Sequence, residues 1–93
     1  LGYYTKGQYK SIQFNGPLEI ASCIGNIAVS EEGDIIIHAH LVVSNEKSEA
    51  FGGHLMKDSP VGATAELVIV ECSGVNLMRS FDEKTQLKLL QLE

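Results

Sequence analysis

The hydrophobic residues of this chain fall in short stretches rich in Ile, Val, Leu and Tyr, separated by Gly, Asn and acidic residues. Stretches of this length and spacing are typical of β-strands rather than helices. The pattern predicts a mostly β architecture with strands over residues 2–5, 9–14, 18–30, 35–44, 49–56 and 63–72. The short turn Lys6-Gly7-Gln8 should join the first two strands into a hairpin.

Two of these strands indicate where the core lies. The strand over 35–44 alternates most clearly, and one of its faces is wholly apolar and is predicted to point inward. That face consists of Ile35, Ile37, Ala39, Leu41 and Val43. The strand over 63–72 is apolar on both faces, as central strands are, so the core is expected there. Gly25 is predicted to mark a bulge or a close backbone approach.

The last fourteen residues, 80–93, fit two structures. Ser80 and Glu83 have the spacing of a helix capping box ahead of several leucines. Alternatively, Leu87 and Leu89 alternate with polar residues after a turn over 82–85, which indicates a strand. We favour the strand.

Composition places the chain among small soluble globular domains. It has 93 residues, 44% hydrophobic and 20% charged, which predicts one domain over residues 1–93. A core of this size is barely adequate, so oligomerisation or a bound metal would add stability. No apolar run approaches the roughly 20 residues that span a bilayer, and no signal peptide pattern occurs. These features predict a cytoplasmic protein without a membrane partner.

The charge pattern argues against nucleic acid as a direct partner. Seven Lys and Arg stand against twelve Asp and Glu, for a net charge of -5, and no two basic residues are adjacent. A phosphate-binding surface needs clustered cations. The two cysteines, Cys23 and Cys72, have no CxxC spacing and are predicted to be reduced core residues.

The three histidines are the candidate chemistry of the chain. In a strand, residues two apart share a face, so His38 and His40 lie side by side, opposite the apolar face. If strand 49–56 pairs antiparallel with strand 35–44, His54 comes close to His38. Gly52 and Gly53 could turn His54 toward the pair through a bulge, or could let another chain or a ligand approach.

Three imidazoles suit zinc, with a fourth position open to water. Glu66 is a candidate carboxylate to orient one of the rings. The simpler interpretation is that His38 and His40 are half-buried sheet residues, hydrogen-bonded to backbone or water, and that His54 is unrelated to them. An open site would also permit metal-dependent catalysis, and no catalytic residue can be assigned. The series Gly33, His38, His40, Glu46, Gly52 approaches the cupin motif, but its spacings fail.

Several motifs together resemble one family. They are Gly16-Pro17-Leu18-Glu19-Ile20, Gly25-Asn26-Ile27, His38-Ala39-His40, Gly52-Gly53-His54-Leu55 and Ala63-Thr64-Ala65-Glu66. In this order and spacing they resemble the PPC domain, the plants-and-prokaryotes-conserved family. The stretch from Arg79 to Leu90 also looks like the family's C-terminal strand pair.

The resemblance implies an α/β (α+β) domain on a mostly antiparallel sheet, assembled as a homotrimer. It also implies that the family's leading strand-helix-strand unit, with its helix, is missing before Leu1. Some prokaryotic members resembling this chain hold a metal with histidines that match His38, His40 and His54, which favours zinc or a similar divalent ion here. The family is often labelled DNA-binding, but the charge of this chain disfavours that role.

Overall fold

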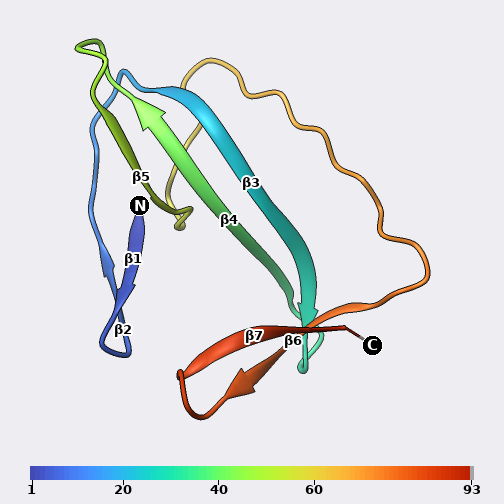
Figure 1. Cartoon of the computed structure of the whole chain (residues 1–93). Coiled ribbons are helices and arrows are strands. Elements are labelled where there is room, and N and C mark those ends of the chain that lie inside the picture. The colour runs from blue at the N-terminus through green and yellow to red at the C-terminus, as the bar shows by residue number, and fades with distance from the viewer. Residues whose placement is uncertain (93) are drawn as a thin grey trace. The chain divides into compact units, whose positions relative to one another are not determined.

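The computed structural model describes residues 1–92, and these residues form strands, turns and coil without a helix (Figure 1). The α part of the expected α/β class is therefore not confirmed. The strands form a seven-stranded mixed sheet in the order β2-β1-β5-β4-β3-β6-β7. Their bounds are β1 Gly2–Thr5, β2 Gln8–Ser11, β3 Glu19–Ser30, β4 Ile35–Ser44, β5 Ala50–His54, β6 Leu77–Asp82 and β7 Leu87–Leu92.

The chain divides into two compact units. Unit 1 comprises Leu1–Gly25 and His38–Thr64, and unit 2 comprises Asn26–Ile37 and the chain from Ala65 onward. Strands β3 and β4 each contribute residues to both units. Among the described residues there is no helix that meets the length and hydropathy required to cross a membrane.

Unit 1 contains the predicted N-terminal hairpin. Strands β1 and β2 pair antiparallel, with Tyr4 opposite Tyr9. Lys6 and Gly7 between them have φ angles of 50° and 78°. Two successive left-handed residues are typical of a type I′ turn, whose twist matches that of the flanking strands. The prediction of a hairpin is confirmed, although the second strand ends at Ser11 rather than at residue 14.

Strand β5 lies between β1 and β4 in unit 1. It pairs antiparallel with β4 over five positions, from Ser44 opposite Ala50 to His40 opposite His54. On its other side, β1 pairs through Gly2 opposite His54. Gly53 allows this approach, because a Cβ there would lie 2.9 Å from the carbonyl oxygen of Gly2. Gly52 and Gly53 both keep the regular register, so the alternative of a bulge is wrong.

Unit 2 contains the β3–β4 turn, the irregular segment over residues 65–76 and the C-terminal hairpin. Strands β6 and β7 pair antiparallel along their whole length, which confirms the strand interpretation of the tail and rules out the helix. The Asp82 carboxylate accepts hydrogen bonds from the amide and hydroxyl of Thr85 and holds the turn. Strand β6 runs parallel to the end of β3, with Val29 opposite Met78, so the sheet is not purely antiparallel.

The predicted central strand over 63–72 is wrong. This segment is coil throughout, and Leu67, Val68, Ile69 and Val70 are 71–93% exposed. It has the composition of a strand, but within the described residues no strand pairs with its backbone. A strand requires such a partner, because its backbone groups have no hydrogen bonds within the segment itself.

The core is correspondingly small. Among the residues whose burial the structure describes, the buried hydrophobic ones are Ala28, Ala39 and Val43. The predicted inward face of β4 is therefore correct for Ala39 and Val43 and wrong for Ile35 and Ile37, which are 74% and 61% exposed. The two cysteines are free, as expected, but both are exposed and neither belongs to the core, because Cys23 lies in the exposed part of β3 and Cys72 in the coil.

Candidate metal centre

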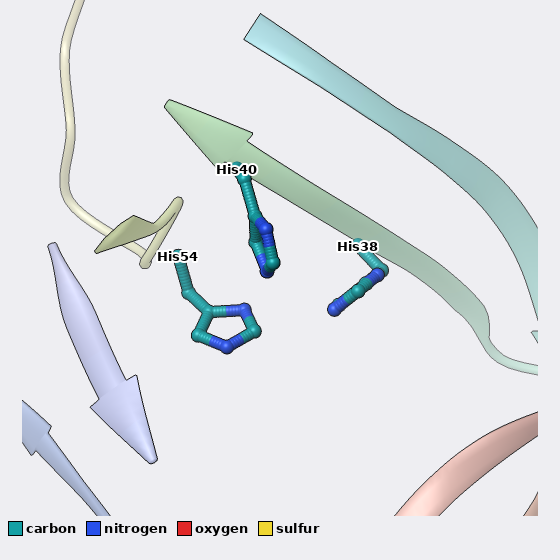
Figure 2. Close-up of side chains that lie close together, drawn as sticks. All are labelled: His38, His40 and His54. Atoms are coloured by element: carbon teal, nitrogen blue, oxygen red, sulfur yellow. The ribbon is translucent and has the colours of Figure 1, made fainter. Parts of the chain in front are cut away.

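The three histidines lie on one face of two neighbouring strands in unit 1. His38 and His40 project from β4, and His54 is the last residue of β5. His40 and His54 are direct partners across the antiparallel pair, so their side chains share a face with each other and with His38. Figure 2 shows the three rings turned toward a common space.

The distances between the rings are those of a single cluster. The centroids of His40 and His54 are 4.3 Å apart, and His38 lies 5.1 Å from His40 and 5.2 Å from His54. One nitrogen from each ring lies within 4.8 Å of those of the other two. Nitrogens that share a tetrahedral zinc are about 3.3 Å apart, so the three nitrogens lie near the spacing that one ion requires. The predicted convergence of the three imidazoles is confirmed, although the sequence placed His54 close to His38 and its cross-strand partner is His40. Coordination of a metal by this cluster stays a prediction.

Burial and charge favour the neutral form of one ring. The pKa of His54 is lowered from 6.5, first by partial burial of the ring and second by the nearby His40. A ligating imidazole must be neutral. The lowered pKa of His54 therefore favours the form of the ring that can bind a metal. His40 is exposed and His38 and His54 are half-buried, so the cluster is open to solvent.

Two neighbours of this cluster were not found from the sequence. The ring of Tyr9 lies 5.1 Å from that of His54, nearly perpendicular to it. The sulfur of Met56 covers Gly2, the residue paired with His54. Both follow from the register of β1, β2 and β5, which hydrophobic alternation alone does not determine.

The remaining predicted participant is Glu66. It lies in the exposed coil of unit 2, whereas the histidines belong to unit 1. Its role in orienting an imidazole stays a prediction.

The donor set fits a zinc-type ion. Three imidazole nitrogens on two neighbouring strands could hold an ion, and tetrahedral zinc takes four ligands of this kind. With three protein ligands, the fourth position is left for water or another small ligand, as in exchangeable and catalytic zinc sites. When bound, the ion would supply a Lewis-acid centre at the sheet surface.

Fold and site together define a small β-sheet protein with an open three-histidine face. A family model described as the Plants and Prokaryotes Conserved (PCC) domain matches residues 1–73, which include all three histidines. The chain belongs to this family. The match ends before β6 and β7, so the resemblance of that hairpin to the family remains a prediction. No curated protein and no solved structure matches the chain.

Proposed function

We propose that this chain is a metal-binding assembly module, a homotrimeric PCC domain that holds zinc or a similar divalent ion on His38, His40 and His54. The observation that carries the proposal is the convergence of three imidazole nitrogens within 4.8 Å of one another. Histidines make up only three of the 93 residues, yet all three meet at one place. Histidines with separate structural roles would have no reason to meet in this way.

Assembly is supported by the apolar surface of unit 2. Leu67, Val68, Ile69 and Val70 are each at least 71% exposed, and burying a side chain of this kind contributes about 1.5–3 kcal/mol. Glu66 and Glu71 bracket this segment. An antiparallel pair of two such segments about a two-fold axis would set Glu66 against Glu71, and like charges opposite each other are destabilising. A cyclic contact with a different surface of the next copy avoids this repulsion and is compatible with the trimer that the family resemblance implies.

The net charge and the free cysteines support the proposed partners and compartment of the protein. A net charge of -5 without a basic cluster disfavours direct binding of nucleic acid. The free thiols of Cys23 and Cys72 suit a reducing compartment such as the cytoplasm.

The metal proposal is tested by stoichiometry. Purified protein that is loaded with zinc and desalted should carry about one zinc per chain by elemental analysis. His54→Ala should lose zinc affinity by more than the roughly 10–100-fold that removal of an outer partner of a ligand costs. Ser44→Ala is the matched control, because Ser44 lies on β4, an even number of residues from His40 and on the same face. A His54→Ala variant that keeps full zinc affinity would overturn the three-histidine site.

A further inference from the structure

An aromatic surface continues the histidine face toward the hairpin. Tyr4 and Tyr9 are paired across β1 and β2, with ring centroids 5.5 Å apart. Tyr9 in turn meets His54 edge to face, with centroids 5.1 Å apart and an interplanar angle of 79°. The two tyrosines and the imidazole therefore form a continuous row beside the candidate metal centre.

The strand register explains why the row is continuous. Gly2 is the partner of His54, and Tyr4 is two residues further along β1, so their positions share one face. Because Gly2 has no side chain, no β1 side chain stands between Tyr9 and His54. The thioether of Met56 lies over Gly2, since a Cβ on Gly2 would lie 2.5 Å from its sulfur. The part of this surface that Met56 forms is thus apolar and polarizable.

The surface is accessible to a small molecule. Tyr4 is 37% exposed and Tyr9 is 45% exposed, so each ring has part of its area in solvent. Three neutral imidazoles leave the charge of a divalent ion uncompensated, which attracts an anionic donor to the fourth position. An anion with a planar ring would coordinate and cover the tyrosine at the same time.

We infer that Tyr4, Tyr9 and Met56 form an apolar subsite for the ligand of the metal, and that this ligand is a small aromatic carboxylate. The inference rests on the proposed function. The carboxylate takes the open position of the ion, and the ring lies against Tyr9. Aromatic rings gain from edge and offset contacts with tyrosine and from contact with a thioether sulfur, beyond the area that they bury. Acetate offers the same carboxylate but has no ring to contact the tyrosines.

Calorimetric titration of the zinc-loaded full chain with benzoate and with acetate tests the inference. Benzoate should bind roughly three- to tenfold more tightly than acetate. Tyr9→Ala should bring benzoate down to the affinity of acetate, whereas Tyr9→Phe should keep the preference. Gln8→Ala is the matched control, because Gln8 is on the same exposed strand but has the opposite parity from Tyr9. The zinc content of every variant is measured first.

The outcomes separate the two proposals. If the wild-type chain takes up no zinc, the proposed function fails and this inference fails with it. If zinc is bound normally but benzoate and acetate bind equally, only the aromatic subsite is overturned. The same holds if Tyr9→Ala keeps both its zinc and its preference for benzoate.

Discussion

Gly25 lies where two strand backbones approach too closely for any side chain. A Cβ at this position would clash with the carbonyl oxygen of His38 and would lie 2.6 Å from the Cα of Ala39. These are backbone atoms of β4, which cannot rotate away. The glycine is thus tied to the geometry of the histidine-bearing strand, and the prediction of a close backbone approach is confirmed.

We expect Gly25→Ala to lower the free energy of unfolding by about 2 kcal/mol or more, because relief of the clash must move β4. Zinc affinity should fall with it, since His38 lies at the point of contact. Urea unfolding and zinc titration measure the two effects. Gly62→Ala is the control, because a Cβ there meets nothing within 4 Å. Equal stability of the two variants would contradict this account.

His54 predicts a pH dependence in the metal-free protein. Its pKa is lowered below 6.5 in the folded state, mainly by burial. As the pH falls through about 6.5, the unfolded chain binds the proton first, so this contribution to stability decreases from there toward the folded pKa. Urea unfolding at about pH 7.5 and 5.5 should show the decrease. His54→Gln should reduce it, and an unchanged slope in that variant would assign the effect to other groups.

At the scale of elements, local patterns predicted strands well where a neighbour in the chain supplies the pairing. The β1–β2 hairpin follows from alternation and a turn alone. The pattern left the pairing of β4 with β5 conditional and placed His54 close to His38, whereas its partner is His40. For the tail, the pattern predicts the last strand after its turn, and the strand before that turn is expected only from the family resemblance. The segment 63–72 was mispredicted because its composition reports a preference for pairing, whereas a strand depends on a partner that composition does not supply. The parallel contact of β3 with β6 also has no local signal.

Arg79 ties the C-terminal hairpin to β3 within unit 2. Arg79 is 7% exposed, and its guanidinium donates from Nη1 to the carbonyl of Lys88 and from Nη2 to Oδ1 of Asn26, at 3.1 and 3.0 Å. The Nε atom is buried and has no partner among the described residues. A buried cation with so few acceptors depends strongly on each of them.

We therefore expect Asn26→Ala to lower the free energy of unfolding by about 1.5–3 kcal/mol, since it leaves a charged donor unpaired. Lys88→Ala should cost less than about 1 kcal/mol. It removes an exposed ion pair with Glu32 at 3.3 Å and retains the carbonyl that Arg79 uses. Thermal unfolding of the two variants provides the comparison, and a greater loss in Lys88→Ala would reverse the assignment.

For the whole molecule, the small number of buried apolar residues contrasts with the large number that face solvent. Ala28, Ala39 and Val43 are buried, whereas four consecutive residues from Leu67 to Val70 are at least 71% exposed. An exposed apolar stretch of this kind marks an interaction surface. It is consistent with the proposed assembly, and the number of subunits stays a proposal.

Val68 is the most exposed of these residues at 93%, so its substitution tests assembly with little effect on the fold of one chain. We expect light scattering to give three times the mass of one chain for the wild type and a monomer for Val68→Lys. Thr64→Lys adds the same charge at an exposed polar position of the same coil and should stay trimeric. A wild type that is monomeric at all concentrations would rule out the trimer.

The pairing of His40 with His54 has a consequence for how the loop between β4 and β5 can change. Side chains alternate along a strand. Inserting or deleting a single residue in the loop would therefore turn His54 to the far side of the sheet, if β5 kept its place beside β4 and its sequence moved by one position. Changes by two residues would restore its side but shift it along β4. Bound zinc would thus indicate whether β4 and β5 have paired in the correct register, and an ion that bridges both strands would stabilise that register.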